Sequence, residues 1–487
     1  MVSAIESIVG SQHVYNVPYT PIGPRGISGL YDINIPESML SHPPLTVIKA
    51  GSTAEISKIL KLANEEKQSI QVRQGAGPVH FDIPNPFHPG SLVLDLRRMR
   101  SIKLFEENSY VEIDPFITQV DLNNYLMELG FWYPPAVPEM TWGGLTSVNI
   151  SSNSFDGDGG KLTDRFILGL QVVLPTGEIV ETGTRSMRKL CGPDMTRFFI
   201  GNQGLFGVVT KIRMRVIPNP VEKHWGLAMF SSLYDLFMAI AVINRKTPSY
   251  PWVMEFMDEK FLELSGMGKS LPQGILLLTS VKGDAPGEVE WKLGRMLEIC
   301  SEAGATEIRS LEKEPIELEV PDYYHKVFAK KNIRELSGGA LMYAMRMANT
   351  EMLKENGLLE IVGECIEPPL SKLQDTIKEI EKCKDHFISQ YPDLEFTIYG
   401  HGGGPTIHPG PICPINWDYE KIVKVVHEVR NYLLKVRLKY NMGCGEQGIF
   451  PNHTEWYKAT HGEVAYNLLK DIKKTFDPNG ILNPGRI

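Results

Sequence analysis

The sequence has no long apolar run, no paired cysteine motif and no excess of positive charge, and each absence excludes a class of protein. One of the longest apolar runs, Leu236 to Ile243, is far shorter than a helix that crosses a membrane. The six cysteines include no C-x-x-C pair, which argues against an iron–sulfur cluster or a zinc ribbon and fits a reducing cytoplasm. The formal net charge of -8 argues against a nucleic-acid partner.

The N-terminus also lacks the features of a secretion signal. The first residues, M-V-S-A-I-E-S-I-V-G, show no basic start followed by an apolar core, so we expect a cytoplasmic protein. What is present is an ordinary globular composition, with 42% hydrophobic and 22% charged residues. A chain of 487 residues is too long for one small core, so the sequence predicts two domains or more.

A strand–helix–strand unit leads into the first of three glycine-rich turns. Residues 45–49 and 70–73 have the pattern of strands, and residues 53–66 have helical spacing. The second strand is followed by Q-G-A-G-P at 74–78. Backbone N–H groups of such a turn face a phosphate in many proteins, although the same turn also forms with no ligand.

Two more glycine-rich segments follow. Residues 141–153, T-W-G-G-L-T-S-V-N-I-S-S-N, crowd small and hydroxyl side chains together, which suits either a ligand or a tightly packed helix. Residues 201–207, G-N-Q-G-L-F-G, lead into an alternating strand with Lys211, Arg213 and Arg215 on its exposed side. Taken alone, each segment is compatible with a purely structural turn.

The composition changes after Pro220. Residues 221–410 alternate strands with charged helices and predict a separate α+β domain. Further on stand H-G-G-G-P-T-I-H at 401–408, placed in a loop after a strand, then G-E-Q-G at 445–448 and D-P-N-G-I-L-N-P-G near the end. A lone histidine in a loop is more often a hydrogen-bonding residue than a metal ligand.

The order of these motifs resembles the FAD-binding oxidoreductases of the vanillyl-alcohol oxidase (PCMH-type) family. Within that family the chain is most similar to the branch of D-lactate dehydrogenase and the FAD subunit of glycolate oxidase. The resemblance implies an α+β fold, with a two-part PCMH-type FAD-binding domain and an inserted α+β (ferredoxin-like) cap domain. We expect the FAD-binding domain over 1–220, the cap over 221–410 and a C-terminal segment, 411–487, that returns to the FAD-binding domain.

The resemblance also implies which residues hold FAD. Relatives that attach FAD covalently have a histidine directly after the first turn, where this chain has Pro78. We therefore expect non-covalent FAD. The implied cofactor-binding residues are Gln74, Gly75, Ala76, Gly77, Pro78, Trp142, Gly143, Gly144, Asn149, Gln203, Gly204, Gly207, Val209 and Asn483.

The same resemblance implies a metal and a reaction. His401, His408 and Glu446 match the family's ligands for a divalent metal such as zinc, manganese or iron. The metal would lower the pKa of a substrate hydroxyl, and FAD would take the hydride from the 2-hydroxy acid. Gln447 stands where the family has a histidine base, and glutamine accepts no proton at neutral pH. Tyr399 is one candidate replacement.

Several alternatives stay open from the sequence. Other candidates for a base or for a cation that binds the substrate carboxylate are Tyr343, Lys330, Lys331, Arg334 and Arg346. The aromatic run at 131–133, with Trp142, suits a phenolic alcohol oxidised without metal. The chain could also be an electron-transferring FAD subunit of a complex, or a non-catalytic FAD binder. Expected partners are a small-molecule substrate and an electron acceptor (a quinone, a cytochrome, an electron-transfer flavoprotein or oxygen), and a homodimer is open.

Overall fold

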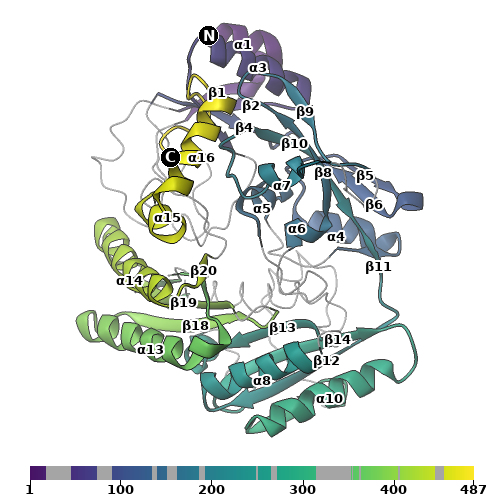
Figure 1. The fold of residues 1–487 in the computed structure, drawn as a ribbon, viewed down its shortest axis with the longest axis vertical. Helices are drawn as coiled ribbons and strands as arrows, with labels where there is room; N and C mark the ends of the chain where they lie inside the picture. The colour runs from purple at the N-terminus through teal and green to yellow at the C-terminus, as the bar shows by residue number, and fades with distance from the viewer. Residues whose placement is uncertain are drawn as a thin grey trace.

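The computed structural model divides the chain into two parts. The residues that it describes are 1–17, 45–73, 90–133, 140–150, 162–185, 192–247, 251–264, 271–313, 353, 355–360, 364–403, 406–444 and 454–487. Figure 1 shows both chain ends in one part, which we call the first lobe, and the largest sheet in the other, which we call the cap. Within the described residues, no helix is long and apolar enough to cross a membrane.

The first lobe opens with a four-stranded sheet in the order β1-β2-β4-β3. β2 and β3 both run parallel to β4, and α3 connects them. The Ser52 side chain caps α3 by accepting a hydrogen bond from the Glu55 N–H, and the apolar face of the helix is buried in the core of this sheet. The elements are α1 (Val2–Val9), a 3-10 turn (Ser11–His13), β1 (Val14–Val17), β2 (Leu45–Lys49), α3 (Thr53–Glu65), β3 (Ile70–Arg73) and β4 (Leu92–Asp95).

The second sheet of the first lobe is antiparallel, in the order β5-β6-β10-β8-β9. Its central strand, β10, follows the third glycine-rich turn, as the alternating pattern predicts. Arg213 was expected to be exposed but is buried, because Glu112 and Glu181 bind its guanidinium group. The elements are β5 (Ile102–Phe105), a 3-10 turn (Glu106–Asn108), β6 (Tyr110–Ile113), α4 (Gln119–Glu128), α5 (Trp142–Val148), α6 (Leu162–Phe166), β8 (Ile167–Val173), β9 (Ile179–Glu181), α7 (Met195–Phe199) and β10 (Val208–Arg215).

The cap sheet consists of two copies of the βαββαβ unit that defines the ferredoxin-like topology. In the first unit the strand order is β15-β12-β14-β13, that is fourth, first, third and second along the chain. The second unit repeats this order as β20-β17-β19-β18. β13 and β18, the second strand of each unit, pair with each other and so join the two units into one antiparallel sheet.

The first unit of the cap comprises β12 (Glu222–Phe230), α8 (Leu233–Lys246), β13 (Pro251–Met257), α9 (Glu259–Leu264), β14 (Ile275–Gly283), α10 (Glu288–Glu302) and β15 (Glu307–Ser310). The second comprises β17 (Ile366–Glu367), a 3-10 turn (Leu370–Lys372), α13 (Leu373–Gln390), β18 (Glu395–His401), β19 (Thr406–Pro414), α14 (Tyr419–Lys439) and β20 (Gly443–Cys444), and β16 (Leu358–Glu360) also pairs with β19.

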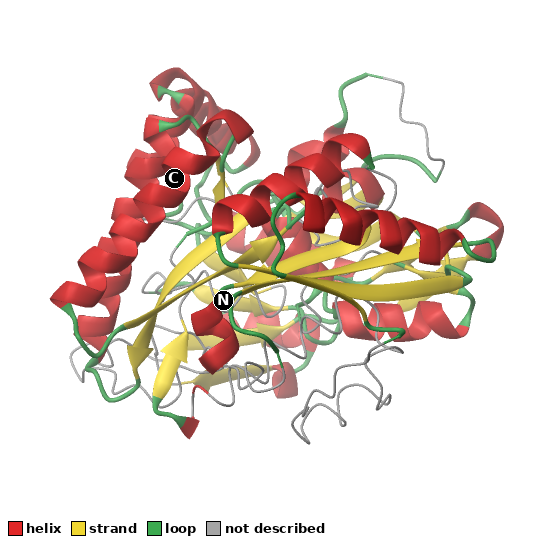
Figure 2. Ribbon diagram, turned by 90° about the horizontal axis from the view of Figure 1, so that it is seen from below, coloured by secondary structure: helices red, strands yellow, loops and turns green. Residues whose placement is uncertain are grey.

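The long helices α8, α10, α13 and α14 pack on the same face of the cap sheet, and Figure 2 shows this part of the molecule from below. They enclose one apolar core, to which Phe237 of α8, Met296 of α10, Ile380 of α13 and Val429 of α14 contribute. Phe256 of β13 packs into the same core. Because side chains alternate along a strand, the residues on either side of Phe256 face away from the helices.

The cap sheet extends beyond the boundary expected at residue 410. That position lies within β19, and α14 and β20 complete the second unit. The chain then continues through α15 (Thr454–His461) to α16 (Glu463–Phe476), whose Phe476 ring stacks on Phe198 of the first lobe at 5.2 Å. The lobes also touch where Trp132 of β7 (Phe131–Trp132), which pairs with β11 (Ile217–Pro218), meets Trp252 of β13 at 5.0 Å.

Candidate functional site

Asn483 joins the C-terminus to the end of β3. Its Oδ1 accepts a hydrogen bond from the Val72 N–H at 2.9 Å. Its Nδ2 donates to the carbonyl oxygens of Gly204 at 2.9 Å and Gln203 at 3.3 Å. This single buried side chain therefore brings the C-terminal motif and the third glycine-rich turn to the point where β3 leads into the first turn. That turn, with Gln74, Gly75, Ala76, Gly77 and Pro78, lies outside the described residues.

Left-handed backbone conformations gather around Asn483. The residues with positive φ here are Asn149 (54°), Gly201 (74°), Gln203 (52°), Gly204 (71°) and Asn483 itself (48°). The Gly201 N–H donates to the Thr146 carbonyl at 2.9 Å, and the Gln203 N–H donates to the Ser147 carbonyl at 3.0 Å. A Cβ on Gly204 would lie only 2.6 Å from Asn483 Nδ2, which explains the glycine there. The described residues of the second and third glycine-rich segments thus lie together with Asn483.

The residues of this cluster divide into those that face the core and those that face outward. Trp142, Gly143, Gly207 and Val209 are buried, and a Cβ on Gly207 would lie 2.5 Å from Val172 Cγ1. Packing of α5 and β8 is sufficient to explain these residue types. The outward edge of α5 is different and carries small residues: Gly144 and Ser147 are half-buried, and Asn149 is exposed.

The residues of this edge fit an FAD molecule. Small side chains and left-handed turns allow a dinucleotide to approach the backbone closely. The Asn149 side chain also has a fixed orientation, since the Thr163 hydroxyl donates a hydrogen bond to its Oδ1. The edge lies next to the end of β3, from which the first glycine turn departs.

The two candidate catalytic histidines lie on strands and not in a loop. His401 is the last residue of β18, and His408 lies in β19, which returns antiparallel to it. Tyr399 is the register partner of His408. The loop expectation was wrong for both histidines, because β18 extends to His401 and β19 begins at Thr406, which is the register partner of His401. The ring centroids of His401 and His408 are 5.0 Å apart.

These side chains occupy the face of the cap sheet that the helices leave uncovered. Ile398 and Ile407 point into the helix-covered core. Tyr399, His401 and His408 are offset from them by one or three residues along their strands and therefore project from the opposite face. Tyr399 and His408 are buried, with a distance of 5.2 Å between their ring centroids.

Each histidine uses its Nδ1 atom within the protein. His401 Nδ1 lies 2.7 Å from Oε2 of Glu255 on β13, and the two residues are register partners. His408 Nδ1 lies 3.4 Å from the Cys365 sulfur. Sequence reasoning missed Glu255, which is 146 positions from His401. The feature of the sequence that could have revealed Glu255 is an acidic residue within the otherwise apolar strand P-W-V-M-E-F-M.

The third expected metal ligand, Glu446, lies outside the described residues, as do Gln447 and the candidates Tyr343, Lys330, Lys331, Arg334 and Arg346. Within the described part of the chain, no group of three or more histidine, cysteine, aspartate or glutamate side chains is arranged to hold a metal ion. The two imidazoles still fit a metal in part, because histidine is a common ligand of divalent metals in proteins.

A buried ion pair stabilises the strand behind His408. Glu364 accepts a hydrogen bond from Arg437 Nη1 of α14 at 2.9 Å, and both side chains are almost completely buried. Burial raises the pKa of Glu364, while Arg437 and Arg430 oppose that shift. Glu364 precedes Cys365, so this pair holds the residue that contacts His408.

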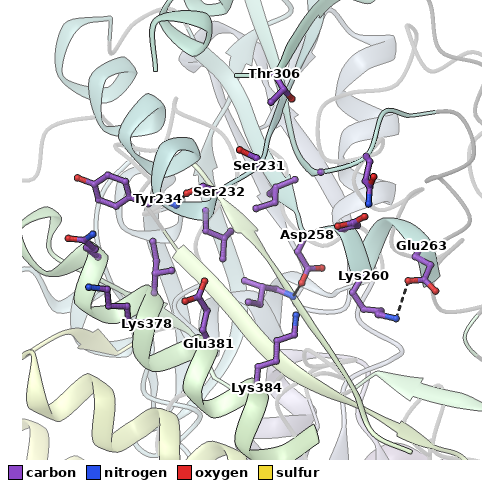
Figure 3. Close-up of a pocket in the computed structure, with 18 residues that line it drawn as sticks. Ser231, Ser232, Tyr234, Asp258, Lys260, Glu263, Thr306, Lys378, Glu381 and Lys384 are labelled. Atoms are coloured by element: carbon purple, nitrogen blue, oxygen red, sulfur yellow. Dashed lines mark hydrogen bonds and ion pairs between the residues drawn. The ribbon is translucent and has the colours of Figure 1, made fainter. Parts of the chain in front are cut away.

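The helix-covered side of the cap has a separate polar cavity of about 890 Å³, shown in Figure 3. None of the expected site residues lines it. Its wall includes Asp258, whose Oδ2 accepts a hydrogen bond from the Ile398 N–H at 2.9 Å. Burial raises the pKa of Asp258 to about 7. Ile398 precedes Tyr399 on β18, so this hydrogen bond joins the cavity wall to the strand that carries Tyr399 and His401.

Comparisons with known proteins agree with this architecture. A model of the C-terminal domain of FAD linked oxidases matches residues 219–487, and a model of an FAD binding domain matches residues 44–183. The glycolate oxidase subunit GlcD of Bacillus subtilis (strain 168) is 26% identical over 454 residues, covering 91% of this chain and 89% of the relative. The mitochondrial D-lactate dehydrogenase (cytochrome) of Arabidopsis thaliana is 27% identical over 451 residues, covering 91% and 73%.

Solved structures share the fold. The 4-ethylphenol oxidase from Gulosibacter chungangensis superposes with a TM-score of 0.75 at 16% identity, covering 100% of this chain and 96% of that one. For p-cresol methylhydroxylase the TM-score is 0.74 at 16% identity, with coverage of 100% and 95%. Since one family model covers more than half of the chain and a second matches the FAD binding domain, the chain belongs to the FAD-linked oxidases of the vanillyl-alcohol oxidase (PCMH-type) family and takes FAD as its cofactor.

Proposed function

We propose that the protein oxidises a 2-hydroxy acid at the hydroxyl-bearing carbon, with non-covalent FAD as the oxidant and a divalent metal at His401 and His408. The observation that carries this proposal is the pair of imidazoles, with ring centroids 5.0 Å apart, on the uncovered face of the cap sheet. Relatives that match along most of their length are named for glycolate and for D-lactate, which supports this substrate class.

The parts of the chain have separate roles in this proposal. Gly144, Ser147 and Asn149 would hold FAD together with Gln74–Pro78, and FAD supplies the acceptor for the hydrogen and electron pair that leave the substrate carbon. His401 and His408 would hold the metal together with Glu446, and the metal would supply a Lewis acid that lowers the pKa of the substrate hydroxyl.

Tyr399 is the described side chain that we assign to the hydroxyl proton in place of the base lost at Gln447. It lies on the same face as the histidines, with its ring centroid 5.2 Å from that of His408. Its burial limits access of water to the reacting oxygen. A phenol hydroxyl both donates and accepts a hydrogen bond, so it suits a substrate oxygen whose protonation changes.

Two alternatives differ in what supports them. Metal-free oxidation of a phenolic alcohol rested on the aromatic run and Trp142, but Trp132, Tyr133 and Trp142 are all buried in apolar clusters. An electron-transferring FAD subunit of a complex remains the second candidate, because the Bacillus subtilis relative is named as a subunit.

Anaerobic bleaching of the bound flavin tests the proposal. We expect bleaching by a D- or L-2-hydroxy acid and not by phenolic alcohols. The His408→Asn substitution should slow bleaching on the order of 100-fold, as expected for loss of a metal ligand or its partner. His386→Asn, which changes an exposed histidine on α13, is the matched control.

The outcomes separate the candidates. Bleaching by phenolic alcohols alone would contradict the proposed substrate class. Bleaching by hydroxy acids that is insensitive to chelator, in a protein that contains no divalent metal, would contradict the metal. Flavin that bleaches only after a partner protein is added would favour the electron-transferring subunit.

A further inference from the structure

We infer that Glu255 is a positioning residue for His401, an assignment that rests on the proposed function of the histidine pair. Glu255 and His401 are register partners across the β13–β18 pair, which is the junction between the two ferredoxin-like units. Oε2 of Glu255 lies 2.7 Å from His401 Nδ1, and the Glu255 side chain is completely buried. The contact therefore fixes one catalytic side chain from the opposite repeat.

The charge environment of Glu255 indicates a role beyond packing. Among the described residues, no lysine or arginine forms an ion pair with it, and its Oε1 has no hydrogen-bond partner. Glu364, also fully buried, likewise has one oxygen without a hydrogen-bond partner, but it differs from Glu255 because it forms an ion pair with Arg437. A buried carboxylate with one unsatisfied oxygen lowers stability relative to an apolar residue, and the neighbouring positions are the apolar Met254 and Phe256.

The chemistry of the contact determines which nitrogen of His401 faces the site. In the arrangement that we infer, Glu255 Oε2 is the acceptor of this 2.7 Å hydrogen bond and His401 Nδ1–H is the donor. A neutral imidazole has a single N–H group, which leaves the lone pair on Nε2. A metal ion or a substrate hydroxyl needs that lone pair. Glu255 thus selects the tautomer and holds the ring plane.

The two histidines differ in this respect. The Nδ1 of His408 has a cysteine sulfur at 3.4 Å, which is a weaker partner than a carboxylate oxygen at 2.7 Å. Of these two Nδ1 contacts, the one made by His401 is therefore the stronger, although both rings lie on the same face.

Nitrogen-15 NMR of the histidine-labelled holoenzyme tests this assignment, with His401 identified by its loss in His401→Asn. In the unmodified protein we expect the Nδ1–H tautomer. Glu255→Leu should convert His401 to a tautomer mixture and weaken Mn²⁺ binding, measured by chelator competition, by about 10- to 100-fold. Glu255→Gln should keep the tautomer, because its amide oxygen still accepts the hydrogen bond, and weaken Mn²⁺ binding less.

Glu395→Gln is the matched control, because it removes one negative charge from the half-buried start of the same strand as His401. It should change neither the tautomer nor Mn²⁺ binding. Glu255→Leu with an unchanged His401 tautomer would overturn the assignment, even if its melting temperature falls. If the unmodified protein binds no Mn²⁺ and no hydroxy acid bleaches the flavin, the proposed function fails, while the tautomer measurement still decides the role of Glu255.

Discussion

The candidate sites of the first lobe and the cap are held together by different kinds of contact. Around Asn483, side-chain groups bind backbone groups, and glycines and left-handed turns bring three segments together. On the cap sheet, side chains bind side chains across strands, as in the Glu255–His401 and Cys365–His408 contacts. The first arrangement forms a shaped backbone surface, whereas the second places ionisable groups next to one another. This difference fits a first lobe that contains the FAD binding domain and a cap that carries the proposed catalytic residues.

The largest effect that we predict is on the first lobe, at Asn483. Asn483→Ala removes the hydrogen bonds to Val72, Gln203 and Gly204 and leaves these buried backbone groups without partners. With about 1–3 kcal/mol for each unsatisfied group, the free energy of unfolding should fall by about 3 kcal/mol or more. Denaturant unfolding checks this value, and flavin fluorescence of the purified protein checks the retention of FAD.

Asn479→Ala is the control, because the Asn479 side chain binds only Asn64 at an exposed position. We expect this substitution to change the free energy of unfolding by about 0.5 kcal/mol or less. If Asn483→Ala is equally mild, side chain–backbone contacts do not shape the first lobe, and the contrast with the cap loses its basis.

The prediction at Asn483 also shows what a sequence reveals. The N-P-G motif, W-G-G and the G-N-Q-G turn are local patterns, so the sequence could indicate that they serve one cofactor. The contacts of individual residues were harder to predict from these patterns. The contact of Asn483 with the flavin stays a prediction, and the sequence did not indicate that its side chain binds backbone groups of Val72, Gln203 and Gly204. A residue type indicates that a position is special and does not indicate which neighbour requires it.

The cap was harder to predict because its site depends on strand pairing. Neither Glu255 nor Cys365 belongs to a motif, and each meets its histidine only through the register of the sheet. The two histidines were found because they stand close together in the sequence. Their placement on strands could not be deduced, because glycines and a proline between them are equally typical of a long loop.

A smaller effect distinguishes glycines that serve packing from glycines in open space. At Gly207, which has an ordinary negative-φ conformation, a Cβ would lie 2.5 Å from Val172 Cγ1 and 2.9 Å from the Val173 carbonyl oxygen. Gly207→Ala should therefore lower the free energy of unfolding by about 1–3 kcal/mol, measured by denaturant unfolding. Gly294→Ala, within α10 and with open space around its Cβ, should instead stabilise the cap by up to about 1 kcal/mol.

Equal responses at the two positions would contradict this division. If Gly207→Ala is neutral, the backbone of the first lobe adjusts to an added methyl group, and its glycines are not held by packing. That result would indicate that the cofactor, and not packing against β8, requires a glycine at position 207. FAD affinity would then be the property to measure.

The smallest effect concerns pH and the connection between the cavity and the histidine strand. Burial raises the pKa of Asp258 to about 7 from the ordinary aspartate value of 3.8, despite the backbone N–H groups of Phe261 and Ile398 and the nearby Lys384 and Lys260. Protonated Asp258 favours the folded state. Its contribution is complete below the unfolded pKa and is lost as pH rises through 7, so the free energy of unfolding should fall by about 1 kcal/mol between pH 6 and pH 7.

Asp258→Asn should abolish this part of the pH dependence, whatever it does to the stability itself, because an amide does not titrate. Glu395→Gln, at the other end of β18, should leave the dependence intact. If the protection factor of the Ile398 amide against hydrogen exchange follows the same pH profile in the unmodified protein and not in Asp258→Asn, the carboxylate controls the strand that carries Tyr399 and His401. A protection factor that does not change with pH would show that Asp258 in the cavity wall has no influence on the histidine strand.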